Sequence, residues 1–344
     1  MIGVAMKRDI QTTSATTHKI AIGFGIAATA AAGVIVAAAD LAFRFALDTT
    51  SRQAMDERLE RLGIDIPADD TYPQTTSDIA DADWFDESRQ PITLTSDDGL
   101  TLHGWLFDPD CAHPTDHLYA ICCHGYTGEP AEMARYAHHY AAMGFTVLTP
   151  AMRAHELSEG RYIGMGWLEY HDLMRWIGLI VDGDPEARIL LHGNSMGGAA
   201  VMMAAGDPSL PRNVIAAIED SGYASAWDQF LSNAKTLYHL PKWLARPFIG
   251  CMSLFCRYRA GYRFRDASCV RALRHTTIPM LFIHGGADDF VSPVSLDRNY
   301  AACSSIDRQR MLVPGAGHTQ AASVDPERYW RKVEHFVHRV FHLE

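Results

Sequence analysis

A serine in this chain stands in the pattern that an enzymatic nucleophile requires. An apolar run typical of a short buried strand leads into Gly193-Asn194-Ser195-Met196-Gly197, and an Ala- and Met-rich run of helical character follows. In a sharp turn from strand to helix the serine takes a strained backbone conformation, which is tolerated when its neighbours in space lack side chains. Its hydroxyl then lies at the positive N-terminus of the helix. We therefore predict that Ser195 is a nucleophile; a glycine-rich turn with an incidental serine is the alternative.

A serine hydroxyl is a weak nucleophile at neutral pH, so it needs a base within hydrogen-bonding reach and an acid that orients that base. His318 follows the last predicted strand in a glycine-containing loop, and no other histidine lies between that strand and the last predicted helix. Three aspartates stand at strand ends where such an acid is expected. Asp288 and Asp289 follow one predicted strand, and Asp220 ends another.

The remaining elements predict the sheet that must position these residues. A hairpin is expected over residues 92–107, and short apolar runs alternate with amphipathic stretches through the rest of the chain. Such alternation indicates a mostly parallel, doubly wound α/β sheet with its site at the carboxyl ends of the strands. The predicted strands are 117–123, 144–150, 187–191, 214–219, 279–284 and 310–313, and the predicted helices are 130–143, 167–181 and 326–341.

An insertion rich in aromatic residues interrupts this alternation over residues 222–276. We predict that it forms a helical lid over Ser195, although part of it must simply pack on the sheet. Tyr223 and Trp227 are candidate substrate contacts within it. Its apolar character favours an acyl or aryl ester over a charged peptide as substrate, and it is also compatible with a surface that faces lipid.

The N-terminal region has the composition of an exported protein. Residues 20–39 contain no charged residue and are long enough to cross a bilayer as a helix. Basic residues precede this run and mainly acidic residues follow it, so the positive-inside rule places residues 1–19 in the cytoplasm and the rest outside. The expected partner is therefore a membrane, with the catalytic domain outside the cell. Signal cleavage after residues 37–39 with secretion, and a buried soluble helix, are the alternatives.

Residues 40–90 are predicted to be a stalk or linker. A short amphipathic helix is expected over residues 56–62, and the stretches around it are rich in Pro, Thr, Ser and acidic residues. The globular domain is then expected to comprise residues 91–344.

Composition narrows the range of functions. The chain has 344 residues, of which 48% are hydrophobic, so a large core is expected, and its net charge of −11 argues against nucleic acid as a partner. Seven cysteines leave at least one thiol unpaired. Cys122 and Cys123 are expected to be small buried hydrophobes, and Cys251 and Cys256 are close enough in sequence to pair. No spacing of Cys and His suggests a metal, and we predict none.

Several segments together resemble α/β-hydrolases, and more narrowly the bacterial membrane-anchored or secreted serine hydrolases described as esterases. The resemblance extends from about Pro91 to the C-terminus. It rests on these segments: His124-Gly125-Tyr126, Arg153-Ala154-His155, Ser158-Glu159-Gly160, Gly193 to Gly197, His284-Gly285-Gly286-Ala287-Asp288 and Gly315-Ala316-Gly317-His318.

This resemblance implies roles for individual residues. It aligns Asp288 with the acid of the family and leaves Asp289 to brace the loop, with Asp220 as a further alternative. The backbone N–H groups of Met196 and Tyr126 would form the oxyanion hole. The Tyr126 ring would cover the loop or line the substrate pocket.

The chain departs from the family pattern at Ala151, where relatives often carry Asp, and at Glu156, where they often carry Gly. These changes concern local geometry and pocket shape. Arg153 and His155, in the same loop, are expected to support the site, with substrate contact as the alternative. The histidines at 138, 139, 335 and 338 are expected to be solvated.

Taken together, the residues and the resemblance predict a serine carboxylic-ester hydrolase that forms an acyl-enzyme on small acyl or aryl esters and uses no cofactor. A lysophospholipase or monoacylglycerol lipase, and a serine peptidase, are the alternatives within the enzymes. A non-catalytic surface binding module is the alternative from another class.

Overall fold

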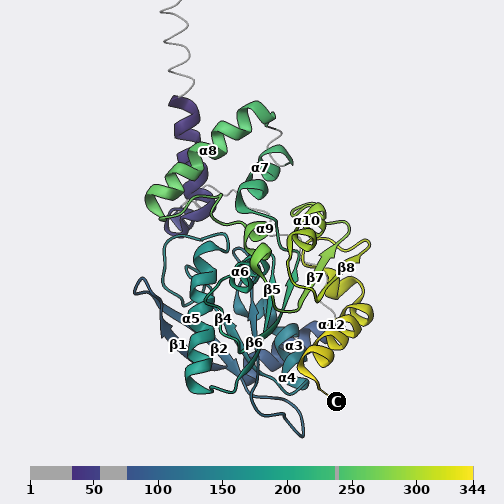
Figure 1. Cartoon of the computed structure of the whole chain (residues 1–344). Helices are drawn as coiled ribbons and strands as arrows, with labels where there is room; N and C mark the ends of the chain where they lie inside the picture. Colours follow the sequence, from purple (N-terminus) through teal and green to yellow (C-terminus); the bar gives the residue numbers. More distant parts are fainter. Residues whose placement is uncertain (1–32, 55–75, 237–239, 344) are drawn as a thin grey trace, which may run out of the picture.

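The computed structural model describes residues 33–54, 76–236 and 240–343, and within them one eight-stranded sheet in the order β1-β2-β4-β3-β5-β6-β7-β8 (Figure 1). β1 and β2 form the predicted hairpin, β2 lies antiparallel to β4, and every pairing from β4 to β8 is parallel. The prediction of a mostly parallel α/β sheet is confirmed. The strands are β1 (Gln90–Thr95), β2 (Thr101–Phe107), β3 (Leu118–Cys123), β4 (Thr146–Pro150), β5 (Arg188–Asn194), β6 (Val214–Asp220), β7 (Met280–Gly285) and β8 (Arg308–Val313).

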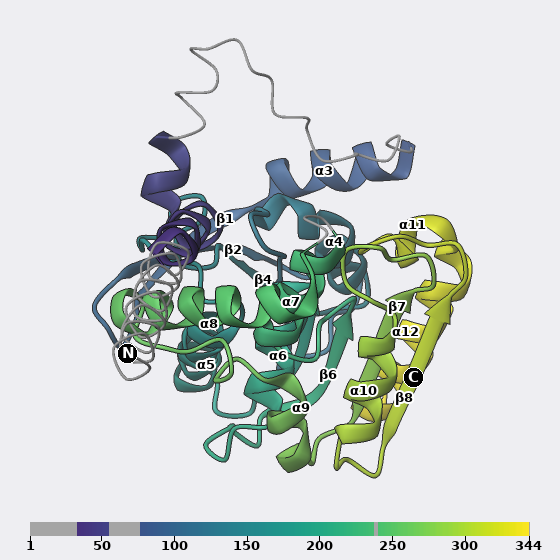
Figure 2. The ribbon, with the colours of Figure 1, turned by 90° about the horizontal axis from the view of Figure 1, so that it is seen from above.

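Helices cover both faces of this sheet (Figures 1 and 2). Because side chains alternate along a strand, neighbouring residues contribute to separate cores. Cys123 belongs to the buried cluster beneath α5 and α6, whereas Cys122 belongs to the cluster beneath α3, α4 and α12, and both are fully buried as expected. The helices are α3 (Thr76–Ser88), α4 (Ala134–Ala142), α5 (Trp167–Gly183), α6 (Met196–Ala205), α10 (Val294–Ala302), α11 (Ala321–Val324) and α12 (Pro326–Phe341).

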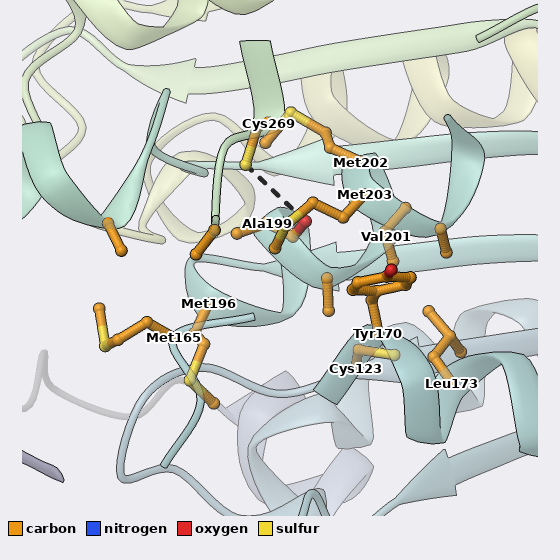
Figure 3. Close-up of a cluster of buried hydrophobic side chains, with 14 of the residues drawn as sticks. Cys123, Met165, Tyr170, Leu173, Met196, Ala199, Val201, Met202, Met203 and Cys269 are labelled. Carbon is orange, nitrogen blue, oxygen red and sulfur yellow. Dashed lines mark hydrogen bonds between the residues drawn. The ribbon is translucent and has the colours of Figure 1, made fainter. Parts of the chain in front are cut away.

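The helix that follows Ser195 is enclosed on every side. All ten residues of α6 are buried, and its sequence, MGGAAVMMAA, contains no charged group. Figure 3 shows Met165, Tyr170 and Cys269 from neighbouring segments around it, with the Cys269 thiol 3.8 Å from the carbonyl oxygen of Ala199. Small residues allow this close packing, and the packing fixes the helix N-terminus where the candidate nucleophile stands.

The insertion between β6 and β7 is helical, as predicted. It contains α7 (Ala226–Thr236), α8 (Lys242–Arg259) and α9 (Cys269–Ala272). α7 and α8 lie beyond the carboxyl ends of the strands (Figure 1), the end of the sheet at which β5 leads into α6. The Gln229 side chain of α7 donates a hydrogen bond of 2.7 Å to the carbonyl of Phe290, so the insertion is attached to the loop after β7.

The first described residues form a helix that packs on the domain. Residues 33–47 are helical, and Ala39, Phe43 and Leu47 are fully buried at a spacing of four. Asp40 pairs with Arg259 at 2.6 Å, so the N-terminal helix meets the C-terminal end of α8 (Figures 1 and 2).

A second helix, α3, replaces part of the predicted linker. Phe85 is buried, and the ring of Trp84 stacks on Phe107 and on His138, with centroid distances of 5.0 and 4.6 Å. The His138 ring also lies 2.7 Å from Asp81, so it is not simply solvated. The prediction of a stalk is therefore wrong for residues 40–54 and 76–88, because apolar side chains anchor both segments to the domain.

Other predictions for the N-terminal region lie outside the described residues. These include most of the apolar segment 20–39 and the short helix 56–62. In the part of the chain that the structure describes, no helix has the length and apolar character needed to cross a bilayer.

Docking of the N-terminal helix leads to a first prediction. Phe43→Ala removes a buried ring and should lower the free energy of unfolding by about 3 kcal/mol, whereas Phe45→Ala, on the exposed side of the same helix, should cost less than about 1 kcal/mol. Urea denaturation of the full chain measures both. Equal, small losses for the two variants would show that the helix does not pack as described.

Candidate active site

Ser195 occupies the sharp turn that its flanking glycines predict. It lies between β5 and α6 with φ +52° and ψ −111°, a strained conformation for a residue with a side chain. A Cβ at Gly193 would lie 2.3 Å from the carbonyl oxygen of Gly197, and one at Gly197 would lie 2.2 Å from that of Cys123. Both positions therefore require glycine, and the turn holds Ser195 nearly buried, with 4% of its surface exposed.

Three loops bring Ser195, His318 and Asp288 into one hydrogen-bonded chain. His318 Nε2 lies 2.8 Å from Ser195 Oγ, and His318 Nδ1 lies 2.7 Å from Asp288 Oδ2. Since an ionised carboxylate can only accept, Nδ1 carries the proton and Nε2 is left to accept from the serine hydroxyl. The residues come from the ends of β5, β7 and β8. This arrangement can remove the serine proton as its oxygen attacks an electrophile.

Asp288 is held as an anion by two backbone N–H groups and two histidines. Its Oδ1 accepts from the backbone N–H groups of Phe290 and Val291, at 3.0 and 2.7 Å, and its Oδ2 lies 3.2 Å from His284 Nε2 in addition to His318. Burial raises the pKa of Asp288, but the hydrogen bonds from His284 and His318 outweigh burial and lower this pKa to about 2.

Sequence reasoning did not identify His284 as a second partner of the acid. The available signal was its position four residues before Asp288, at the buried end of β7. Burial lowers the pKa of His284, but the hydrogen bond to Asp288 and the nearby Glu219 raise it.

The other two aspartates occupy different environments. Asp289 is exposed. Asp220 is fully buried, its Oδ2 accepts from the Tyr329 hydroxyl at 2.9 Å, and burial raises its pKa. Its backbone carbonyl accepts the Ser195 N–H at 2.8 Å, so it braces the serine turn through the main chain. Of the three candidates, Asp288 is the one that the structure places against His318.

The loop after β3 lies directly against Ser195. A Cβ on Gly125 would be 3.5 Å from the Cβ of Ser195, so the backbone approaches closely here. The His124 ring fixes this loop through two hydrogen bonds. Its Nδ1 donates to the Gly125 carbonyl at 2.9 Å, and its Nε2 accepts from the Met152 N–H at 3.0 Å. Burial lowers the pKa of His124 to about 3 and keeps the ring neutral.

The two predicted oxyanion donors flank Ser195. Tyr126 follows Gly125 in this loop, and Met196 is the first residue of α6, where backbone N–H groups have no acceptor within the helix. Their role as donors stays a prediction.

Arg153 and His155 support this loop, in keeping with the expected structural role. His155 Nε2 accepts from Thr127 N–H at 3.1 Å, and its Nδ1 donates to the Arg153 carbonyl at 2.8 Å. The Arg153 guanidinium donates two hydrogen bonds of 2.6 Å to Asp172 and two, of 2.9 and 3.2 Å, to Asp98. Burial lowers the pKa of His155, so the neutral ring can accept the backbone proton.

The side chain of Tyr126 points to the N-terminal helix. Its hydroxyl donates to the carbonyl oxygen of Ala46 at 2.5 Å, and the Arg52 guanidinium carbon lies 5.4 Å from its ring centroid. The N-terminal helix therefore contacts the loop beside Ser195. No sequence signal marked this contact, since its acceptor is a backbone carbonyl 80 positions away.

The predicted substrate contacts in the lid are partly or fully covered. Tyr223 is buried in the same cluster as Met196, whereas Trp227 is half-buried with the Arg265 guanidinium 4.3 Å from its ring centroid. Their contact with substrate, like that of the Tyr126 ring, stays a prediction. Phe290, which we did not single out, has its ring centroid 5.1 Å from that of His318.

All seven cysteines are free thiols in the structure, including Cys251 and Cys256, whose short separation in sequence would allow a local pair. Among the residues that the structure describes, no three His, Cys, Asp or Glu side chains are grouped as a metal site requires.

A mostly parallel sheet with a strained serine turn between a strand and a buried helix is the architecture of α/β hydrolases. Residues 120–332, well over half of the chain, match the Alpha/beta hydrolase family, so the protein belongs to that family.

The chain is also similar to individual proteins. The chain is 29% identical to the YqkD protein of Bacillus subtilis strain 168 over 213 residues, which are 62% of this chain and 67% of the relative. Among solved structures, the Pyrococcus furiosus esterase Pf2001 is similar with a TM-score of 0.59 and 21% identity, over 80% of this chain and 99% of the esterase. The Pyrococcus horikoshii acylaminoacyl peptidase is similar with a TM-score of 0.54 and 16% identity, over 74% and 42% of the two chains. At these identities the two structures show the fold alone.

The environment of Asp288 leads to a prediction about pH. Because its pKa is lower when folded than when unfolded, Asp288 stabilises the fold above about pH 4 by about 2 kcal/mol, and this contribution is lost as the pH falls toward 2. The difference in free energy of unfolding between wild type and Asp288→Asn should therefore shrink as the pH is lowered from 5 to 2.5. Denaturant titrations at several pH values measure it. The matched control is Asp289→Asn, which should stay within about 0.5 kcal/mol of wild type throughout, and a pH-independent loss for Asp288→Asn would contradict the account.

Proposed function

We propose that this α/β hydrolase is a serine carboxylic-ester hydrolase that acts through an acyl-enzyme on Ser195. The observation that carries the proposal is the hydrogen-bonded chain from Ser195 through His318 to the Asp288 carboxylate. A hydroxyl, an imidazole with its acceptor nitrogen on that hydroxyl, and a buried carboxylate on the other nitrogen are the parts that nucleophilic acyl transfer uses.

Each group has a defined step. Ser195 Oγ attacks the ester carbonyl while His318 Nε2 takes its proton, and the proton then passes to the leaving alkoxide oxygen. Asp288 keeps Nδ1 protonated and stabilises the imidazolium that forms. In the second half, His318 removes a proton from water, the resulting hydroxide attacks the acyl-serine, and Ser195 leaves with the proton returned. The chemistry needs no cofactor.

The oxyanion of each tetrahedral intermediate is assigned to the N–H groups of Met196 and Tyr126. The packing of Gly125 against Ser195 and the start of α6 at Met196 support this assignment, because both backbones lie next to Ser195. In a nearly buried site such donors are stronger than in water.

The preference for small acyl or aryl esters rests on enclosure. Ser195 is 4% exposed and the His318 side chain is 22% exposed, so the site as described admits a small substrate more readily than a folded polypeptide. Phe290 beside His318 adds an aromatic wall. A lipase acting on longer chains, or a peptidase, would need the lid to open further.

The location outside the cytoplasm is proposed on the sequence alone. It rests on the uncharged segment 20–39 and the charges around it, with membrane anchoring preferred to signal cleavage.

A pair of adjacent aspartates tests the mechanism. Asp288→Asn should lower kcat for p-nitrophenyl acetate by about 10³- to 10⁴-fold, because His318 loses the partner that keeps Nδ1 protonated. Asp289→Asn, a change of the same chemistry one residue away, should alter kcat less than about threefold. Esters from acetate to palmitate and a ferulate ester then define the acyl preference.

Activity that rises with chain length would favour the lipase alternative, and cleavage of aminoacyl anilides would favour the peptidase. Comparable activity of Asp288→Asn and wild type on every ester would contradict the assignment of the acid.

A further inference from the structure

The outer face of α8 exposes large apolar side chains at helical spacing. Trp243, Leu254 and Tyr258 are 77%, 61% and 88% exposed, whereas Ala245, Ile249, Met252 and Cys256 on the opposite face are buried. Exposed aromatic and aliphatic residues on one helix face normally mark a surface that contacts something apolar. We define the α8 face as Trp243, Arg246, Pro247, Leu254, Arg257 and Tyr258, all of which are exposed.

The α8 face is also cationic in an acidic protein. α8 contains four Lys or Arg residues and no Asp or Glu, whereas the whole chain carries a net charge of −11. Arg259 is paired with Asp40, but within the described residues neither Arg246 nor Arg257 forms an ion pair. Arg257 donates instead to the carbonyl of Gly261 at 2.6 Å. The two exposed guanidinium groups are therefore available to anions.

The first described residues, from Gly33 onward, lie on the same side of the domain as this face (Figure 1). The N-terminal helix contacts the C-terminal end of α8 through the Asp40–Arg259 pair and through the Arg259 guanidinium, 5.4 Å from the Phe43 ring centroid. Its first described residues project from the domain on the side where α8 lies (Figure 1), and α8 runs across that side in the view from above (Figure 2). Residues 20–32, which precede this helix, contain no charged residue.

From these features we propose that the α8 face docks on an anionic lipid surface. The indole ring of Trp243 and the phenol ring of Tyr258 each have an apolar body and a polar group. Such rings are favoured in the headgroup region, where apolar chains meet water. Leu254 contributes apolar area below the headgroups, and Arg246 and Arg257 meet the lipid phosphates. A second copy of this face would set cations against cations, which disfavours self-association as the reason for its exposure.

Tryptophan fluorescence tests this contact without any assay of hydrolysis. Trp243 is the one exposed tryptophan of the seven in the chain, and no tryptophan precedes Trp84, so quenching by lipid cannot arise from the segment before the domain. The full chain is reconstituted in phosphatidylcholine vesicles containing phosphatidylglycerol, with acyl chains either brominated or not. We expect bromine to quench the wild-type emission, and Trp243→Phe to abolish most of that quenching.

Matched charge variants complete the test. Arg246→Gln with Arg257→Gln should reduce the quenching on vesicles with phosphatidylglycerol, whereas Arg328→Gln with Arg331→Gln, two exposed arginines on α12, should leave it unchanged. The proposal is overturned if wild type and Trp243→Phe are quenched equally. A second pair of results would also overturn it: the chain is a dimer in detergent that Tyr258→Ser dissociates, and brominated lipid does not quench Trp243. A second copy of the chain would then cover the α8 face.

Discussion

The site depends on a backbone strain that the rest of the molecule must hold in place. Ser195 takes φ +52° at the junction of β5 and α6, and the turn closes because Gly193 and Gly197 let the two backbones meet. Complete burial of α6 and the hydrogen bond from Ser195 N–H to the Asp220 carbonyl keep the turn from relaxing. The parallel order of β5, β6, β7 and β8 then places the loops that carry Asp288 and His318 at the same sheet edge.

Around this turn, polar side chains fix loops more often than they face the substrate. Burial keeps His124 and His155 neutral, and both rings hold the segment around Gly125. The Arg153 guanidinium forms hydrogen bonds to the carboxylates of Asp172 and Asp98. The N-terminal helix adds a further contact through Ala46 and Tyr126. The residues before the predicted domain boundary thus belong to the surroundings of the site and are not a separate spacer.

Local signals were sufficient for the parts of this arrangement that depend on local geometry. The apolar strand, the glycines and the small-residue helix around Ser195 together predict the serine turn. The last helix, Pro326–Phe341, was predicted with its observed bounds. The choice among Asp220, Asp288 and Asp289 depends on which side chain faces His318, and sequence spacing alone cannot decide that. The sequence did not predict helix α3. Among its 13 residues only Phe85 is buried, so the helix shows no clear apolar period.

The central claim is that Ser195 is activated by His318 in the folded protein. Its most direct test is labelling of the full chain by a fluorophosphonate probe, followed by peptide mapping of the modified residue. Wild type should carry the probe on Ser195, and His318→Ala should label at least about a hundred times more slowly, because an unactivated hydroxyl reacts poorly. Absence of labelling in wild type, or equal labelling of His318→Ala, would contradict the account and favour a non-catalytic binding module on the same fold.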